Sequence, residues 1–270
     1  MSLRNTARAL PTLLRVGLAE AVAYRAEMFV WVLATTMPLV MLALWTAVAR
    51  EGGGGALGRY GQSGFTAYFL SAFIVRQLTG CWAFYEMNVD VRQGTLGMRL
   101  LRPVHPLAAY TVENIAAVPM RALVSLPAAL VALAVLQPRG LTRDPALWAL
   151  WTASLLGAWS ITLFVNLAVG CSAFFIEQSL KLMDLWLVLY FVLSGYTIPI
   201  DLFSPRVQSL VDWLPFRYQL GFPVAIMTGA LGRQEAAALL IRQWAWVAAT
   251  AGVTAVLWRR GIARFGAHGG

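Results

Sequence analysis

Side chains that could carry out catalysis are few in this chain, and they lie far apart. Of the two histidines, His105 stands between prolines and His268 lies in a glycine-rich tail, and neither has a nearby carboxylate or metal-ligand spacing. The cysteines Cys81 and Cys171 lie in apolar stretches, where a structural disulfide is not expected, and two distant cysteines make no zinc site. The sequence therefore predicts no catalytic residue and no metal site.

A phosphate-binding loop is also missing from the sequence. Four consecutive glycines, Gly52 to Gly55, indicate a flexible loop, because a Walker A loop needs a Gly-Lys-Ser/Thr ending. The single lysine, Lys181, follows Leu180 and has no glycine before it. We therefore expect that this chain binds no nucleotide cofactor through such a loop, and that any ATP it uses is hydrolysed by another chain.

The composition is typical of an integral membrane protein. Hydrophobic residues make up 59% of the 270 residues and charged residues only 12%, whereas a soluble domain carries about 25% charged residues. The net charge is +9, and all basic residues except Lys181 are arginines. Because no basic cluster has aromatic residues interleaved in a polar background, we expect these arginines to meet phospholipid head groups and not nucleic acid.

The apolar stretches predict an all-α integral membrane protein whose residues 1–270 form a single transmembrane domain. A spanning helix needs about 20 mainly apolar residues. Six stretches meet this requirement, at about 28–49, 65–86, 108–136, 146–175, 183–200 and 237–258.

Residues 1–25 predict an amphipathic helix that lies at the membrane interface. Leucines from Leu3 to Leu18 share one side, basic residues cluster beside them, and Pro11 predicts a kink. A disordered basic tail is the alternative. If residues 1–25 lie on the cytoplasmic side, the cytoplasmic loops carry eleven Arg and Lys residues and the outer loops carry eight. Because cytoplasmic loops are usually richer in Arg and Lys, this count favours cytoplasmic termini.

Charged residues within the predicted spans are functional candidates. Arg76 lies about 12 residues into the second span, near mid-membrane at about 1.5 Å per residue. Glu113 and Arg121 lie two turns apart in the third span. We expect Arg76 to pair with a carboxylate or to line a transport path with Glu113, Arg121 and the aromatic residues Tyr190 and Tyr196. The alternative is that Arg76 makes backbone hydrogen bonds and Arg121 reaches the inner interface.

The most informative polar segment, 87–106, separates the second and third spans. It carries three arginines and ends on prolines, which predicts a helix from Glu86 to about Leu101 that Pro103 closes. A second unusual segment, 201–235, alternates prolines, aromatic residues and small residues. We expect it to form two short helices that re-enter the outer leaflet, because irregular backbone survives there only when packed against protein or water.

These two segments resemble the corresponding parts of ABC-2 type permeases, the membrane subunits of ATP-driven exporters. The resemblance covers nearly the whole chain, and it is greatest for the branch that includes drug and viologen exporters. One departure is Thr95, where family members often carry an acidic residue. The resemblance therefore does not fix how this position would contact the ATPase. The residues of the first segment that carry the resemblance are Asp90, Arg92, Gly94, Thr95, Leu96, Leu100, Leu101, Arg102, Pro103 and Pro106. Those of the second are Leu193 to Ile200, including Pro199, then Pro205, Leu214, Pro215, Phe216, Pro223 and Gly229.

The resemblance implies a fold like that of type V ABC exporters, with six spans, an N-terminal interfacial helix, a cytoplasmic coupling helix and an outer re-entrant hairpin. It implies a location in a bacterial cytoplasmic membrane. The partners would be ABC ATPase subunits, which hold ATP and Mg²⁺, and a second identical or related permease. The expected cargo is lipophilic or amphiphilic. Arg92, Arg99 and Arg102 would meet acidic residues of the ATPase, or else anionic lipid head groups.

Two other classes of function remain open from the sequence. A membrane scaffold or assembly protein without a transport path would have no ATPase partner. An intramembrane enzyme would show activity as a purified chain without any partner. Co-purification of a P-loop ATPase whose turnover depends on this chain separates the transporter from both alternatives.

Overall fold

The computed structural model of this protein describes residues 3–23, 30, 33, 35–51, 57–136 and 140–268. These residues form helices and no strand. In chain order the helices are α1 (Leu3–Ala23), α3 (Met37–Glu51), α4 (Gln62–Thr79), α5 (Ala83–Gln93), α6 (Leu96–Leu100), α7 (Pro106–Leu136), α8 (Pro145–Ser172), α9 (Leu180–Leu193), η1 (Ile200–Leu202), α10 (Pro205–Val211), α11 (Pro215–Gln219), α12 (Gly221–Met227) and α13 (Arg233–His268).

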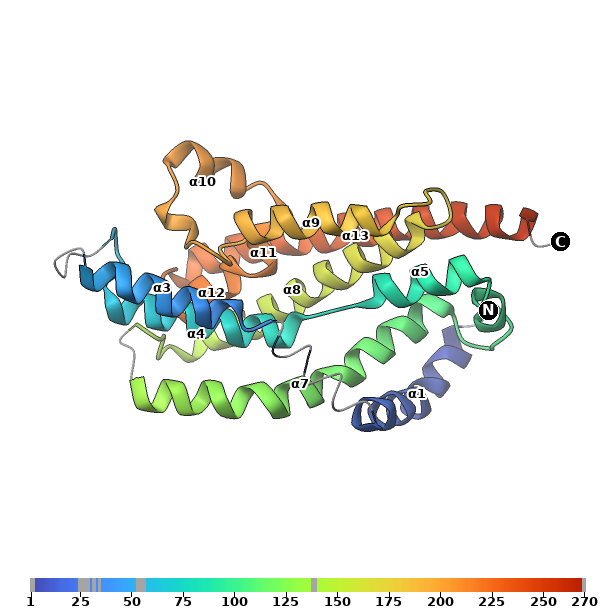
Figure 1. Cartoon of the computed structure of the whole chain (residues 1–270), viewed down its shortest axis with the longest axis horizontal. Coiled ribbons are helices and arrows are strands. Elements are labelled where there is room, and N and C mark those ends of the chain that lie inside the picture. Colours follow the sequence, from blue (N-terminus) through green and yellow to red (C-terminus); the bar gives the residue numbers. More distant parts are fainter. Residues whose placement is uncertain are drawn as a thin grey trace.

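The long helices lie roughly along one axis of the molecule (Figure 1). α1, α5 and the last turns of α13 lie at one end, and α10 lies toward the other. Among the described residues, three helices are long and apolar enough to cross a membrane: α7, α8 and α13. They coincide with the predicted spans at 108–136, 146–175 and 237–258.

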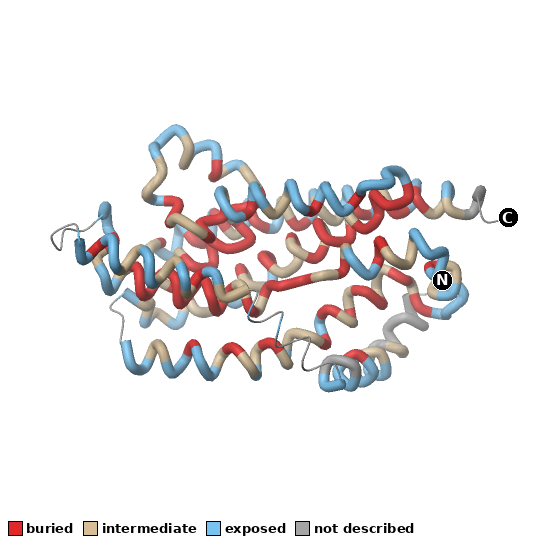
Figure 2. Tube along the Cα trace, viewed as in Figure 1, coloured by how far each residue is buried: buried red, intermediate tan, exposed pale blue. Residues whose placement is uncertain are grey.

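Helix α8 is the centre of the bundle. In its most apolar window 61% of the residues are buried, against 17% for α7 and 22% for α13. Figure 2 shows the same contrast, with buried residues concentrated toward the middle of the molecule. The exposed sides of α7 and α13 carry leucine, valine and isoleucine, and such large apolar surfaces suit contact with lipid or another membrane subunit.

The interface between α8 and α13 is fixed by one buried polar side chain. Gln243 of α13 donates hydrogen bonds to the carbonyl oxygens of Ser154 in α8 and Tyr218 in α11, both at 2.8 Å. Gly157 of α8 makes room for it, because a Cβ at this position would lie 2.7 Å from Cδ of Gln243. A buried amide that satisfies two backbone carbonyls fixes the position of α13 along α8.

The predicted span at 65–86 ends earlier than expected, because its helix is interrupted after Thr79. Helix α4 ends at Thr79, residues 80–82 leave the helix, and α5 begins at Ala83. The backbone N–H of Trp82 is satisfied by Oδ1 of Asn114 in α7, at 3.1 Å. Asn114 therefore compensates for a hydrogen bond that a continuous helix would have made within itself.

The predicted span at 183–200 also ends earlier than expected, at Leu193. Gly195 adopts φ +88°, which side-chain-bearing residues rarely adopt, and its carbonyl accepts a hydrogen bond of 2.7 Å from the Tyr68 hydroxyl. The helix that remains, α9, has 14 residues and is about 21 Å long, shorter than the hydrocarbon core. The first predicted span, 28–49, lies partly outside the described residues. Its C-terminal part, from Met37, lies in α3.

Candidate functional site

The polar segment folds as two helices and not as the single helix predicted from Glu86 to Leu101. α5 ends at Gln93 and is followed by Gly94, whose φ of +75° is the left-handed conformation common after a helix. α6 starts two residues after Gly94. Thr95 Oγ1 donates a hydrogen bond of 2.6 Å to Oδ1 of Asp90, one turn back in α5. The predicted residues Gly94 and Thr95 therefore form a tight turn that sets the direction of α6.

Arg99 of α6 connects this turn to α7. Its Nε lies 2.7 Å from Oδ2 of Asp90, and its Nη1 lies 2.8 Å from Oε1 of Glu113. Its guanidinium group also lies 4.3 Å from the ring centre of the buried Tyr110, whose hydroxyl donates to Asp90 at 2.6 Å. This partly buried network of two carboxylates and one guanidinium holds α5, α6 and α7 together.

The transport-path hypothesis expected Glu113 to lie with Arg76 and Arg121. The structure places it in this network with Arg99 instead. Glu113 also lies beside Glu86 of α5. Helix α5 begins after the break that ends α4, so Glu86 lies outside the spanning part of α4. Partial burial, followed by repulsion from Glu113, raises the pKa of Glu86 to about 7. Two neighbouring carboxyl groups with one arginine thus leave one carboxyl that titrates near neutral pH.

The three arginines of the segment have different surroundings. Arg99 is used by the network, and Arg92 donates a hydrogen bond to the carbonyl of Ile176 in the α8–α9 loop. Asn88 of α5 donates to Ser179 of the same loop. Among the described residues, the side chain of the exposed Arg102 makes neither an ion pair nor a hydrogen bond. Arg102 is therefore the arginine that is available to a partner.

Arg102 belongs to an exposed tip that projects from this frame. Met98 is 66% exposed and Leu101 82%, and Arg102 and Pro103 follow directly. Leu96 and Pro106 are buried and anchor the two ends of the tip. We call Met98, Leu101, Arg102 and Pro103 the α6 tip. It offers apolar surface with one cation, a composition suited to contact with another protein.

His105 has a structural role between the tip and α7. Its Nδ1 accepts a hydrogen bond from the backbone N–H of Leu107, and its ring centre lies 5.4 Å from that of Trp258 in α13. Burial lowers the pKa of His105 and so favours the neutral ring that this hydrogen bond needs.

A second group of predicted residues meets between α4 and α9. The guanidinium group of Arg76 lies 5.4 Å from the ring centre of Tyr190, and the ring centres of Tyr190 and Tyr196 are 5.7 Å apart. Arg121 approaches from α7, where Gly80 makes room for it, since a Cβ there would lie 2.3 Å from Nη1 of Arg121. Four of the five residues suggested for a transport path thus lie in one region, and Glu113 lies elsewhere.

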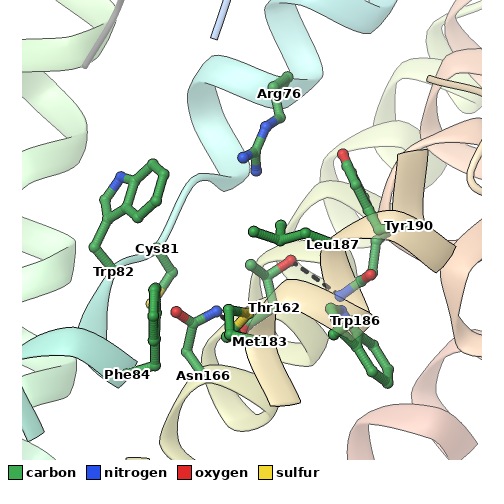
Figure 3. A pocket seen from close by; sticks show the side chains of 11 residues that line it. Arg76, Cys81, Trp82, Phe84, Thr162, Asn166, Met183, Trp186, Leu187 and Tyr190 are labelled. Atoms are coloured by element: carbon green, nitrogen blue, oxygen red, sulfur yellow. Dashed lines mark hydrogen bonds between the residues drawn. The ribbon is translucent and has the colours of Figure 1, made fainter. Parts of the chain in front are cut away.

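Arg76 and Tyr190 also line a partly enclosed cavity, shown in Figure 3, in which about 30 Å³ is open to the centre of a water-sized sphere. Its walls come from α4, α5, α8, α9 and α11. Asn166 of α8 and Gln219 of α11 contribute polar side chains, and Trp82, Phe84 and Trp186 contribute aromatic rings. Figure 3 shows the Arg76 side chain extending toward the residues of the other helices.

The comparison with known proteins assigns this architecture. The sequence profile described as "ABC-2 family transporter protein" matches residues 28–269, which is most of the chain. The chain belongs to the ABC-2 family. No curated protein matches it. Members of the ABC-2 family are membrane components of ABC transporters that act with an ABC ATPase, and the three long apolar helices agree with a multi-pass membrane protein.

In this ABC-2 chain the predicted re-entrant segment folds as a series of short helices. Pro199 precedes η1, Pro215 and Phe216 begin α11, and Pro223 lies in α12. Gly229 follows α12 with φ +62°. Phe216 and Pro223 are buried, so α11 and α12 pack against the bundle, whereas α10 is largely exposed. The segment contains more helical pieces than the two predicted, and its re-entry into the outer leaflet stays a prediction.

The sequence analysis missed Asn166 and Gln219 as site residues. Both side chains are almost fully buried, at 5% and 2% exposed, and both line the cavity with Arg76. The available signal was their polarity within largely apolar segments, which is costly in a membrane unless the side chain has a role. No group of three metal-binding side chains occurs within the part of the chain that the structure describes.

Proposed function

We propose that this chain is the permease subunit of an ABC exporter. It would move a lipophilic or amphiphilic substrate across the bacterial cytoplasmic membrane, paired with a second identical or related permease. ATP would be hydrolysed by separate ABC ATPase subunits, since the sequence has no Walker A motif. The α6 tip is the observation that carries this proposal, because it is an exposed apolar surface braced by a partly buried ion network.

The α6 tip suits the transmission of force from a cytoplasmic partner. Arg99, Asp90 and Glu113 connect α6 to α5 and α7, while Arg92 and Asn88 connect α5 to the α8–α9 loop. A push on the tip would therefore reach α7, and through α5 the start of α9. Lipid head groups need no such rigid frame, which favours a protein partner over a lipid surface.

The arrangement of the helices supports six crossings with both termini in the cytoplasm. α1, α5 and the end of α13 lie at one end, and α10 lies toward the other (Figure 1). Helices α7, α8, α9 and α13 then account for four passes, and α3 and α4 account for two. α1 packs along α7, where Gly17 makes room for Ala116, and we place it at the inner membrane interface.

The proposal is tested by charge reversal at the exposed arginine of the tip. The tagged chain is purified from its native membrane, and we expect an ABC ATPase to co-purify whose turnover depends on this chain. Arg102→Glu should weaken ATPase binding about tenfold and lower its stimulation, because reversing an interfacial charge creates repulsion in place of attraction.

The matched control is Arg206→Glu, since Arg206 is an exposed arginine on α10, distant from the α6 tip. This variant should leave co-purification and ATPase turnover unchanged. If no ATPase co-purifies with the wild-type chain, the proposed transport function is wrong and the scaffold function is favoured. If Arg102→Glu behaves like Arg206→Glu, the tip is not the contact.

A further inference from the structure

The cavity between α4, α5, α8, α9 and α11 is lined by the interruption between α4 and α5. Residues 80–82 leave the helix, and Cys81 and Trp82 line the cavity directly after the turn that carries Arg76. Non-helical backbone at membrane depth is tolerated where it is covered by protein or faces a polar cavity. The break thus opens a polar space within a single subunit.

Three buried polar atoms of the lining residues have no hydrogen-bond partner in the described structure. They are Oδ1 of Asn166, Oε1 of Gln219 and Nε of Arg76. Leaving a buried polar group unpaired costs about 1–3 kcal/mol. The two amide oxygens can only accept hydrogen bonds and the arginine can only donate, so the group that satisfies them must offer both donors and acceptors.

The orientation of both amides is fixed by their neighbours. Nδ2 of Asn166 donates to the carbonyl of Thr162 at 2.8 Å. Thr162 Oγ1 donates to Ala158 and so presents its lone pairs to Nε2 of Gln219, at 3.5 Å. Turning either amide over would set an oxygen against another oxygen, so the unpaired atoms are oxygens.

The charge of the cavity is positive. Within the described ranges, no carboxylate lies within ion-pair distance of Arg76 or Arg121, and the two guanidinium groups are close enough to repel each other. The guanidinium group of Arg76 lies 5.4 Å from the ring centre of Tyr190 and contacts the hydroxyl of Tyr196. Desolvated positive charge without a counter-ion in the protein favours an anion as ligand.

We propose that this cavity binds a phosphate or carboxylate group that carries a neighbouring hydroxyl. Arg76 would bind the anionic oxygens, and the amide oxygens of Asn166 and Gln219 would accept hydrogen bonds from the hydroxyl. The rings of Trp82, Phe84 and Trp186 supply apolar walls for an attached chain. Binding as such does not depend on the proposed function, but calling this ligand a cargo rests on it.

Binding is measured on the purified full-length chain in a neutral detergent, without an ATPase. The probes share one hydrocarbon chain length and differ in the head group: lysophosphatidylglycerol, a fatty acid and an alkyl trimethylammonium. We expect saturable binding in the order lysophosphatidylglycerol, fatty acid, trimethylammonium, with about tenfold between the first and the last. Equal binding of the phosphate and the trimethylammonium probes would overturn the proposal.

Two variants assign the contacts. Arg76→Gln should weaken lysophosphatidylglycerol and fatty acid binding about tenfold, because both probes lose the charge-assisted hydrogen bonds. Gln219→Leu should weaken only lysophosphatidylglycerol, about fivefold, because the fatty acid has no hydroxyl to donate. The control Arg206→Gln, at an exposed arginine, should change neither. Gel filtration and thermal unfolding establish that each variant is folded.

Gln219→Leu keeps the test decisive if Arg76→Gln is not recovered in folded form, since leucine replaces an amide that is only partly satisfied. If folded variants at both positions bind like the wild-type chain, the assignment is wrong. Competition with glycerol 3-phosphate identifies the source of the anion: displacement indicates a soluble phosphate ester, and its absence an amphiphile. If lysophosphatidylglycerol and glycerol 3-phosphate both fail to bind while an ATPase co-purifies, this inference fails and the proposed function stands.

Discussion

At the scale of single residues, the arginines of the polar segment show that charge alone does not predict a contact. The hypothesis that Arg92, Arg99 and Arg102 all face a partner treats them as equivalent. The structure gives Arg99 two carboxylates and Arg92 a backbone carbonyl, and it leaves Arg102 exposed. Asp90 and Glu113 explain the difference, because they lie nine positions before Arg99 and fourteen after it and meet it only in the folded chain.

Glu86 makes the stability of this region depend on pH. Its pKa is raised from 4.5 to about 7, by partial burial and then by Glu113, so the folded chain favours the protonated carboxyl. The associated stability is fully present below about pH 4.5 and is lost as the pH rises through about 7. We expect the melting temperature of the wild-type chain to fall between pH 6 and pH 8 relative to that of Glu86→Gln.

Thermal unfolding of the two proteins across this pH range checks the expectation. Glu177→Gln is the control, since Glu177 is an exposed carboxylate in the α8–α9 loop and its replacement should leave the pH dependence as it is in the wild type. Parallel curves for the wild type and Glu86→Gln would show that Glu86 ionises below this range.

At the scale of elements, the turn between α5 and α6 depends on a single backbone conformation. Gly94 has φ +75°, and the space around its missing Cβ is open, so only the conformation restricts substitution. We expect Gly94→Ala to destabilise the turn by about 1 kcal/mol. Amide hydrogen exchange in α6 should accelerate correspondingly, about fivefold.

Gly97 provides the matched control for this substitution. It also has open space around a missing Cβ, but it lies within α6 and has no positive φ. Gly97→Ala should therefore leave α6 unchanged or stabilise it by about 0.5–1 kcal/mol. Faster exchange in both variants, or in neither, would contradict the role given to Gly94.

The sequence predicts the elements unequally well, for physical reasons. α7, α8 and α13 follow from length and apolar composition alone, because a continuous apolar stretch has few other solutions in a membrane. The break at 80–82 could not be foreseen from Gly80, because glycine is also common within spanning helices. The side chain that satisfies the freed backbone N–H, Asn114, comes from another helix. The cavity depends in the same way on Arg76, Asn166 and Gln219, which only the fold brings together.

At the scale of the whole molecule, the proposed topology places 87–106 and α10 on opposite sides of the membrane. Cys81 and Cys171 are both buried, so the natural chain offers little background for labelling by thiol reagents. Gln93→Cys and Ser204→Cys each place one exposed thiol at opposite ends. In intact cells a membrane-impermeant maleimide should label Ser204→Cys and not Gln93→Cys.

Permeabilised cells supply the control, since both variants should be labelled there. Labelling of Gln93→Cys alone in intact cells would invert the orientation. Labelling of both in intact cells would mean that the two segments lie on the same outer side and that the number of crossings between them is even.

The hydrogen bonds of Gln243 have a mechanical consequence for the whole transporter. One amide holds carbonyls of α8 and α11 from its place in α13, so sliding α13 along α8 would break both hydrogen bonds at once. Movement of the three helices as one unit would keep both hydrogen bonds. If the α6 tip receives force from a partner, as proposed, we expect bending where the helices are already interrupted, at residues 80–82 and at Gly195.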